Sequence, residues 1–258
     1  MMYQRRRNTD FIDSITSHRS VRKFTDEKIP SEDLEKILSA TRTSSSSSHG
    51  QAYSIVNVSS PEKRELLVDL VGNQPHVAIS SHFFVFCADL HRINALGKRE
   101  GIDMKTSMET TEMFIVATVD AALAAQNTAI AAEALGYGIV YTGGIRNNIE
   151  KVSNLLHLPE LTYPVFGMCI GVPIEEEVAD VKPRLPFEAI YFDDEYPTFE
   201  KVENYLNEYD LEMKEHYENR LTGKRLNKTW SQVMIDKRKE PRRLDIKDYL
   251  KKQGFPLL

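Results

Sequence analysis

The sequence of 258 residues is poor in the residues that build disulfide scaffolds and zinc sites. Its two cysteines, Cys87 and Cys169, are 82 positions apart inside the apolar runs FFVFCADL and PVFGMCIGVP. We therefore expect buried thiols in a reducing compartment. The seven histidines contain no H-x-x-x-H pair, and neither CxxC nor DxDxDG spacing occurs. No metal site is predicted from these patterns.

Long apolar runs and an excess of positive charge are also missing. The longest apolar-leaning stretch, 116–145, is interrupted by Asp120, Gln126, Asn127 and Glu133, so no membrane span is predicted. No apolar segment follows the N-terminal arginine cluster, so we expect no signal peptide and a cytoplasmic location. A net charge of −5 argues against a dedicated nucleic-acid-binding protein.

The sequence does contain alternating helical and strand-like patterns. Its length and its 41% of hydrophobic residues suit one α/β or α+β unit with a sizeable core. The apolar spacing predicts a short helix from residue 11 into HRSVRKF, a helix between Ser31 and the serine run at 44–48, and helices over 60–71, 112–135 and 149–156. It predicts strands over 53–58, 82–90, 139–142 and 164–172, with a mobile loop or broken helix at 91–111. Four strands separated by helices indicate a layered domain.

Caps and buried faces follow from the same patterns. Asp10 is a possible cap of the first helix, Ser31 is expected to cap the second, and Asn147 or Asn148 the last. The second helix is expected to bury Leu34, Ile37, Leu38 and Thr41, and the third Leu66, Leu67, Leu70 and Val71. The alanine-rich helix is expected to be packed closely on all sides. The run of five serines at 44–48 predicts a loop.

The last third differs in charge. Residues 174–218 contain 15 acidic and 4 basic residues, a balance of −11, whereas 220–252 contain 12 basic and 4 acidic, a balance of +8. Tyr205, Tyr209, Met213 and Tyr217 are spaced by four, which predicts a stripe for the core or for a partner. Trp230 is expected to serve packing more than base stacking, because no other aromatic is interleaved with it.

Three segments carry residues suited to binding an anion or a planar ligand. The block His18 to Phe24 places guanidinium, hydroxyl and imidazole groups where a phosphate could accept hydrogen bonds. In Lys182-Pro183-Arg184-Leu185-Pro186, prolines hold two cations in extended backbone. In Tyr141-Thr142-Gly143-Gly144, the two glycines have no Cβ, so a backbone N–H can approach a planar ligand closely. Taken alone, each of the first two segments is better explained as solvated basic surface than as a binding site.

Several catalytic and nucleotide-binding signatures are missing. The segment GYGIVYTGG does not supply G-x-G-x-x-G, and neither a P-loop nor G-x-S-x-G occurs. A nucleotide site of the dinucleotide-fold type and a serine nucleophile are therefore not predicted.

Several segments follow one another along the chain: HRSVRKF, the serine run with Gln51, GNQPHV, FFVFCADLHR, AAQNTAIAAEALGYGIVYTGGIRNNIE, FGMCIGVP and KPRLP. Taken together and in this order, they resemble the flavin-dependent nitroreductase family. The resemblance is greatest to its NADPH-dependent branch of flavin reductases and oxygen-insensitive nitroreductases. It extends from about residue 11 to DYLKKQGF. It implies an α+β fold with a central, mostly antiparallel sheet flanked by helices. It further implies one FMN-binding domain over 1–258, with a core at about 10–190 and a C-terminal extension, about 191–258, that wraps the partner subunit of a homodimer.

The resemblance also implies which residues bind FMN. Arg19 and Ser20 would hold the phosphate with His18, Arg22 would reach the pyrimidine edge, and Gln74 would hydrogen-bond the isoalloxazine. Ser46 would contact the cofactor from the partner subunit. Because five serines follow one another, the assignment to Ser46 is open by one or two positions. Tyr141, Thr142, Gly143 and Gly144 would lie against the ring, with the N–H of Gly143 facing flavin N5; Thr142 replaces a bulkier aliphatic residue common there. Lys182 and Arg184 would complete the phosphate pocket.

Gly143 and Arg22 would then have the catalytic roles. Arg22 would stabilise the negative charge of reduced flavin, and an N–H at N5 would orient the atom that accepts and delivers hydride. Turnover by a ping-pong scheme would reduce free flavin, nitroaromatics, quinones or similar acceptors.

NADPH would need a cation for its 2′-phosphate, and Arg146, Arg220, Lys224 and Arg225 are candidates. For the C-terminal cations there is an equally supported alternative to NADPH binding. They would form a solvated basic face that pairs with the acidic segment of the partner subunit. For the whole protein, three alternatives stay open. These are a flavin-dependent oxidase or dehydrogenase of one metabolite, a flavin-binding regulatory protein without turnover, and nucleic-acid binding through 220–252.

Overall fold

A computed structural model describes residues 11–258, so the possible cap at Asp10 lies outside the described residues. The described chain divides into two compact units, one made of residues 11–176 with 243–258 and the other of residues 177–242. Unit 1 contains the strands found among residues 11–258: β1 (Tyr53–Asn57), β2 (His82–Asp89), β3 (Gly138–Thr142) and β4 (Thr162–Gly171). They form one four-stranded sheet in the order β1-β2-β4-β3. Every neighbouring pair is antiparallel, which confirms the α+β fold class.

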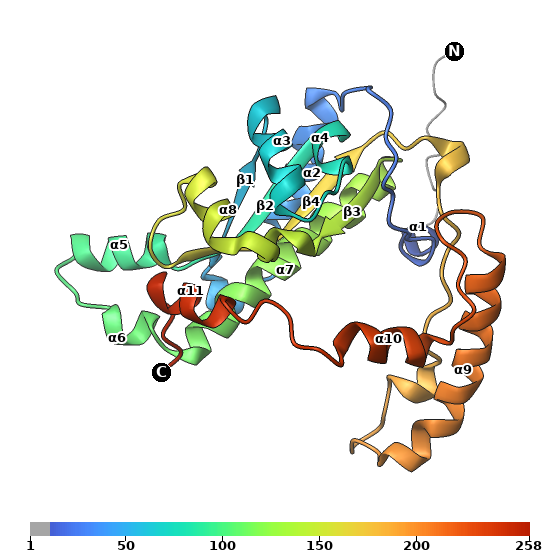
Figure 1. Cartoon of the computed structure of the whole chain (residues 1–258). Coiled ribbons are helices and arrows are strands. Elements are labelled where there is room, and N and C mark those ends of the chain that lie inside the picture. Colours follow the sequence, from blue (N-terminus) through green and yellow to red (C-terminus); the bar gives the residue numbers. More distant parts are fainter. Residues whose placement is uncertain (1–10) are drawn as a thin grey trace. The chain divides into compact units, whose positions relative to one another are not determined.

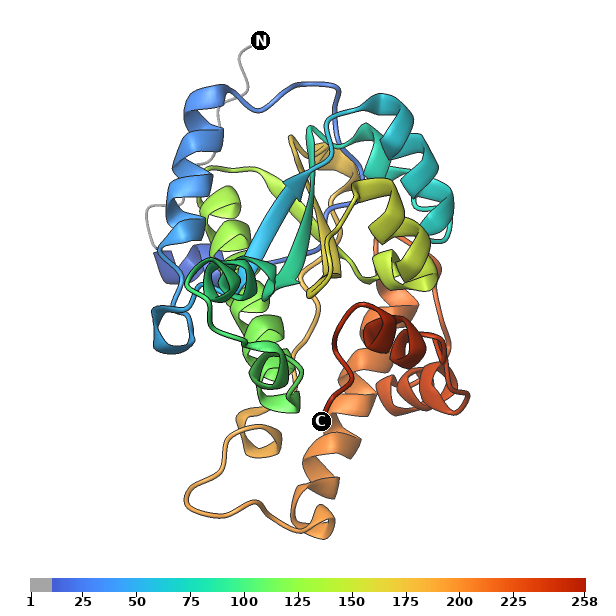
Figure 2. The ribbon, with the colours of Figure 1, turned by 90° about the vertical axis from the view of Figure 1, so that its left-hand side faces the viewer.

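Helices cover two faces of this sheet. Figure 1 shows α7 (Thr111–Ala134) running along one face. In Figure 2, α2 (Ser31–Arg42) lies beside α7, and α3 (Pro61–Leu70) lies with α8 (Ile149–Leu156) on the opposite side of the sheet. The shorter elements of unit 1 are α1 (Phe11–Thr16), η1 (Ser47–His49), α4 (His76–Ile79), α5 (His91–Arg99), α6 (Lys105–Met108), η2 (Gly143–Asn148) and α11 (Ile246–Lys252).

Local sequence explains where these helices begin and end. Ser60 caps α3 by accepting a hydrogen bond from the N–H of Lys63, and Pro61 occupies the first helical position. Thr110 caps α7 by accepting from the N–H of Met113. Gly72 follows α3 at a φ of 91°, which a residue with a Cβ rarely adopts.

Some expected caps and faces are wrong. Ser31 is the first residue of α2, and Pro30 occupies the cap position. Since proline has no side-chain acceptor, this end has no side-chain cap. Leu38 is 38% exposed and Leu66 is 54% exposed, because the buried stripes of α2 and α3 are narrower than the spacing of their leucines suggested. Within 91–111, residues 91–99 form α5 and residues 105–108 form α6, so the broken-helix alternative is confirmed there.

The alanine-rich helix α7 is buried on one side only. Ala117, Ala121, Ala124 and Ala125 are buried, whereas Ile115, Val119 and Leu123 are 49%, 48% and 41% exposed. The expectation of close packing on all sides is therefore wrong for the single chain. Of the residues that the structure describes, those of α7 form a helix long and apolar enough, by length and composition, to match a membrane span. Core helices pass the same test, and α7 packs on the sheet.

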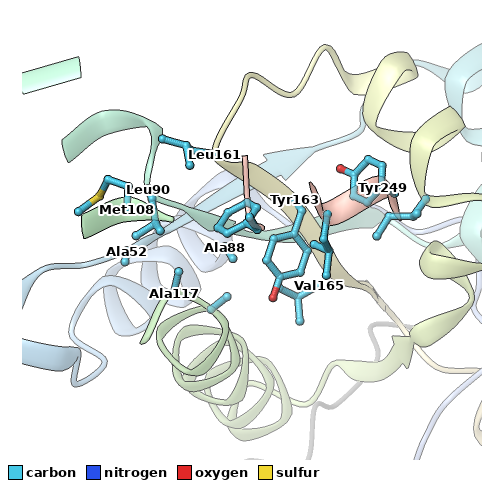
Figure 3. Close-up of a cluster of buried hydrophobic side chains, with 13 residues drawn as sticks. Ala52, Ala88, Leu90, Met108, Ala117, Leu161, Tyr163, Val165 and Tyr249 are labelled. Atoms are coloured by element: carbon cyan, nitrogen blue, oxygen red, sulfur yellow. The ribbon is translucent and has the colours of Figure 1, made fainter. Parts of the chain in front are cut away.

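The core of unit 1 includes a cluster around Tyr163, shown in Figure 3. The hydroxyl of Tyr163 points toward α7, where it hydrogen-bonds to Thr118. The ring of Phe255, beyond α11, packs edge-on to Tyr163 with 5.2 Å between centroids. Cys87 and Cys169 are free and fully buried, as predicted, and burial raises the pKa of each thiol to about 12.

Unit 2 contains α9 (Phe199–Asn219) and α10 (Trp230–Arg238), preceded by η4 (Phe187–Ala189). Three of the four residues of the predicted stripe, Tyr209, Met213 and Tyr217, are buried and pack with Val233 of α10. The ring of Trp230 lies 5.5 Å from that of Tyr209, which confirms its expected packing role. Thr229 and Gln232 form a capping box at the start of α10.

Candidate functional site

The block predicted to bind phosphate lies along the free edge of the sheet. Ser20 pairs with Ile139 of β3 in a parallel bridge, and the N–H of Val21 donates to the Ile139 carbonyl at 2.8 Å. This close approach requires the glycine at 138, because a Cβ there would stand 2.7 Å from Cβ of Val21. The block is thus held beside the strand that leads into Gly143 and Gly144.

The polar side chains of this block have distinct environments. The Nδ1 atom of His18 lies 2.7 Å from Oε1 of Glu133 on α7. Arg19 and Arg22 are exposed. An Nη1 atom of Arg22 donates to the carbonyl of Ser20 at 3.5 Å. The two guanidinium groups therefore face solvent, where an anionic ligand can reach them.

The two glycines after β3 are not equivalent. A Cβ added to Gly143 would meet only Nη2 of Arg146, at an ordinary contact distance of 3.5 Å. A Cβ added to Gly144 would stand 2.2 Å from the Val71 carbonyl oxygen and 2.4 Å from Nε2 of Gln74. Gly143 therefore leaves an open backbone face, whereas Gly144 is required for close packing on the end of α3.

The residues before these glycines are held firmly. The Tyr141 ring packs edge-on to Phe166 at 5.2 Å between centroids, and its hydroxyl donates to Oε1 of Gln126 at 3.2 Å. Burial, followed by the nearby Glu133 charge, raises the pKa of Tyr141 well above its ordinary value. Thr142 is fully buried. Neither Tyr141 nor Thr142 is therefore available as a proton donor at neutral pH.

A hydrogen-bond network holds Gln74 and Asn147 on the carbonyl of Val71. The Val71 carbonyl accepts from Nε2 of Gln74 at 2.8 Å and from Nδ2 of Asn147 at 3.1 Å. Arg243 donates to Oδ1 of Asn147 from Nε at 3.0 Å and from Nη2 at 2.8 Å. Because the Gln74 nitrogen is engaged, its side-chain oxygen is the atom that can accept from a ligand.

His76, at the start of α4, is close enough to Arg22 to be affected by its charge. It is 6% exposed, and its Nε2 is buried with no partner among residues 11–258. Burial, and next the Arg22 guanidinium, lower the pKa of His76 to about 4. The imidazole is therefore neutral throughout the physiological pH range.

This shift predicts acid sensitivity. The unfolded chain takes up a proton at His76 near pH 6.5, whereas the folded chain does so only near pH 4, so stability falls as the pH drops between these values. Between pH 7 and pH 5 the loss from this group is expected to be about 2 kcal/mol. Urea unfolding at the two pH values measures it, and His76→Gln should reduce the difference. An unchanged difference in the variant would contradict the assignment.

The serine loop is fastened to α7. Oδ1 of Asp120 accepts from the N–H of Ser47 at 3.0 Å, and Oδ2 accepts from the N–H of Ala52 at 2.9 Å. The hydroxyl of Ser46 accepts from the N–H of Gln51 at 3.2 Å. The loop is thus ordered by a buried carboxylate, and the role of Ser46 at a cofactor stays a prediction.

The remaining predicted cations divide between the units. Arg146 belongs to unit 1, where its Nη1 donates to the Val165 carbonyl. Burial, and next the neighbouring Arg243, lower the pKa of Arg146. Lys182, Arg184, Arg220 and the exposed Arg225 belong to unit 2.

Unit 2 has its own open pocket, with a volume of about 400 Å³. Lys182, Arg184 and Arg220 line it together with aromatic and aliphatic side chains, Tyr209, Tyr217 and Trp230 among them. The guanidinium of Arg220 lies over the Tyr217 ring at 5.6 Å, and its Nε is buried without a partner in the described part of the chain. The pocket therefore combines cations with stacking surfaces.

The polar residues of α7 form contacts that the sequence did not assign. Asp120 holds the serine loop, Gln126 holds Tyr141, Asn127 donates to the Ala40 carbonyl at 3.1 Å, and Glu133 holds His18. In the sequence these four polar residues stand out within an otherwise apolar helix. That contrast could have indicated their roles, because a polar side chain on a buried helix face requires a hydrogen-bond partner.

An antiparallel sheet between helix layers, with exposed cations on the segment that pairs with β3, defines an α+β domain. Residues 15–172 match the nitroreductase family, and residues 182–258 match the nitroreductase family C-terminal domain. The chain belongs to the nitroreductase family.

Known relatives are similar over nearly the whole chain. An FMN reductase (NADPH) from Bacillus subtilis is 42% identical over 245 residues, 95% of this chain and 97% of that protein. The structure of NfrA1 from B. megaterium is also 42% identical, covers 95% of this chain and 98% of its own, and has a TM-score of 0.90. The NADPH:FMN oxidoreductase from Vibrio harveyi, complexed with NAD+, is 34% identical with a TM-score of 0.81, over 95% of this chain and 98% of that chain.

Proposed function

We propose that this protein is an FMN-dependent oxidoreductase that takes electrons from NADPH and reduces flavins, nitroaromatics, quinones or similar acceptors. The observation that carries the proposal is the 42% identity, over 95% of the chain, with an FMN reductase (NADPH). Relatives from Staphylococcus haemolyticus and V. harveyi, named as an NADPH-dependent oxidoreductase and an NADPH:FMN oxidoreductase, support it further.

The residues of unit 1 fit FMN. The open backbone face of Gly143 leaves room for a planar ring, which a Cβ would obstruct. Exposed Arg19 and Arg22 and the hydroxyl of Ser20 lie on a segment paired with the same strand, and they are suited to an anionic group. When bound, FMN supplies a hydride acceptor and donor at N5.

Each residue then has a proposed task. His18, Arg19 and Ser20 bind the flavin phosphate, and Arg22 offsets negative charge at the pyrimidine edge. The oxygen of Gln74 accepts from the ring, and the N–H of Gly143 orients the ring at N5. Tyr141, Thr142 and Gly144 fix the backbone of Gly143. The resemblance further assigns Lys182 and Arg184, which belong to unit 2, to the phosphate, and Ser46 to a contact from a partner subunit.

The nucleotide phosphate has candidates in both units. We assign Arg220 first, because its buried Nε has no partner among residues 11–258 and it lines the aromatic pocket of unit 2. Arg225 is exposed and can assist. Arg146 stays a weaker candidate, since its Nη1 is engaged by a backbone carbonyl.

We further propose a cytoplasmic homodimer in which the whole chain acts as one FMN-binding domain. Of the predicted extension at about 191–258, residues 243–258 belong to unit 1 of the same chain, and we propose that residues 191–242 wrap the partner subunit. The exposed stripe Ile115, Val119 and Leu123 on α7 supports an apolar interface, because the three residues are spaced by four on one helix face.

Purified protein tests the function directly. It should carry FMN, and addition of NADPH without oxygen should bleach the visible flavin absorbance rapidly. Steady NADPH consumption should follow with free FMN, a quinone or a nitroaromatic, and initial-rate lines should be parallel. Absent bleaching would favour an oxidase or dehydrogenase of one metabolite. Bleaching without turnover would favour a regulatory protein, and salt-sensitive retention on heparin would favour nucleic-acid binding.

Arg19→Ala is expected to lower FMN affinity at least tenfold, which is about 1.4 kcal/mol, because a charge-assisted hydrogen bond to phosphate is lost. Dialysis followed by the flavin-to-protein absorbance ratio measures this loss. Arg42→Ala, an exposed guanidinium at the end of α2, is the control and should retain FMN. A fully yellow Arg19→Ala protein after dialysis means that Arg19 does not bind the phosphate.

A further inference from the structure

The carboxylate of Glu133 lies where general electrostatics disfavours a negative charge. Glu133 is the residue before Ala134, the last residue of α7, and a helix C-terminus carries partial negative charge. Its side chain is only 15% exposed, so it has lost much of its hydration. A carboxylate in this position needs a compensating partner.

That partner is His18. The two residues are 115 positions apart in sequence, yet Oε1 of Glu133 and Nδ1 of His18 lie 2.7 Å from each other. Because the carboxylate engages Nδ1, Nε2 is the ring nitrogen on the side of the imidazole turned away from Glu133. The contact therefore fixes the orientation of the ring.

The position of His18 makes this orientation relevant to a ligand. His18 is next to Arg19 and two residues before the Ser20 bridge with β3. The peptide around it is held by the sheet edge, while its side chain is held by α7. Backbone and ring are thus fixed by two separate elements, which preorganises the group before a ligand arrives.

We propose that Glu133 is a positioning residue for the flavin phosphate, acting by holding His18 so that Nε2 donates to a phosphate oxygen. This inference rests on the proposed function, since it assumes that FMN binds at this block. Glu133 itself does not touch the cofactor. Its effect should consequently be confined to ligands that carry the phosphate.

Riboflavin provides the discriminating ligand, because it has the same ring as FMN and lacks the phosphate. Quenching of flavin fluorescence on titration of flavin-free full-length protein gives the dissociation constant of each. Glu133→Ala is expected to weaken FMN binding about tenfold and riboflavin binding less than about twofold. Glu133→Gln retains an acceptor oxygen for Nδ1–H and should keep FMN affinity within about threefold of the unchanged protein.

Two controls separate positioning from a general structural effect. The combined variant His18→Ala/Glu133→Ala should bind FMN as His18→Ala does, because Glu133 acts through the imidazole. Glu112→Ala removes an exposed carboxylate at the other end of α7 and should change neither constant. Glu133→Ala loses the hydrogen bond to His18 and relieves repulsion at the helix C-terminus, so its thermal midpoint should stay close to that of the unchanged protein.

The outcomes are distinguishable. Equal loss of FMN and riboflavin binding, unchanged FMN binding, or additive effects of the two substitutions would overturn the role of Glu133 while leaving the proposed function intact. Failure of the unchanged protein to bind either flavin would overturn the proposed function itself.

Discussion

Gly144→Ala is expected to lower the free energy of unfolding by about 3 kcal/mol, since overpacking against fixed backbone is among the most destabilising single changes. The added Cβ would stand 2.2 Å from the Val71 carbonyl oxygen and 2.4 Å from Nε2 of Gln74. That carbonyl already accepts hydrogen bonds from Gln74 and Asn147. It cannot withdraw without breaking this network, so the end of α3 would have to move. Urea unfolding measures the loss.

Gly143→Ala is the matched control for stability and a test of the site. Its Cβ would meet only Nη2 of Arg146 at 3.5 Å, so the free energy of unfolding should stay within about 0.5 kcal/mol. FMN affinity should nevertheless fall at least about tenfold, because the methyl group occupies the face proposed for the ring. A Gly144→Ala protein of unchanged stability would contradict the close packing. Undiminished FMN binding by Gly143→Ala would remove Gly143 from the site.

Asp120→Asn is expected to destabilise the protein by about 3 kcal/mol and to open the serine loop, because it turns an acceptor into a donor facing a buried N–H. Asp120 is 1% exposed and accepts from the N–H groups of Ser47 and Ala52. The loop that it holds contains Ser48, His49 and Gln51 at φ values of 48°, 58° and 48°. Such left-handed backbone persists only where its surroundings impose it.

Chemical unfolding and limited proteolysis within residues 44–51 measure this effect. Asp69→Asn, an exposed carboxylate on α3, is the control and should shift stability by less than about 0.5 kcal/mol. An unchanged unfolding midpoint and an uncut loop in Asp120→Asn would show that the loop keeps its conformation without the carboxylate.

Much of the fold could be predicted from local pattern. The strands at 53–57, 82–89, 138–142 and 162–171 and the long helix at 111–134 lie within a few residues of their expected ranges, because alternation and helical periodicity are properties of neighbouring residues. The buried faces were predicted less well. Leu66 is exposed although its spacing suited the core, since which leucines of a helix are covered depends on the elements that pack against it.

The candidate site shows the same division. The anion-binding residues of the block at 18–22 could be named from their chemistry, and so could the glycine pair. Which glycine is open could not, because Gly143 and Gly144 are identical in sequence terms. Only the end of α3, with Val71 and Gln74, distinguishes them.

By itself the sequence determined the strands, most of the longer helices, the burial of both thiols and the motifs that carry the family resemblance, since each depends on residue types at short spacing. Only the tertiary structure decided what the polar residues of α7 do. Asp120 meets Ser47 across 73 positions and Glu133 meets His18 across 115. No local pattern encodes such pairs, because a side chain acquires its partner only when packing of the whole unit brings distant segments together.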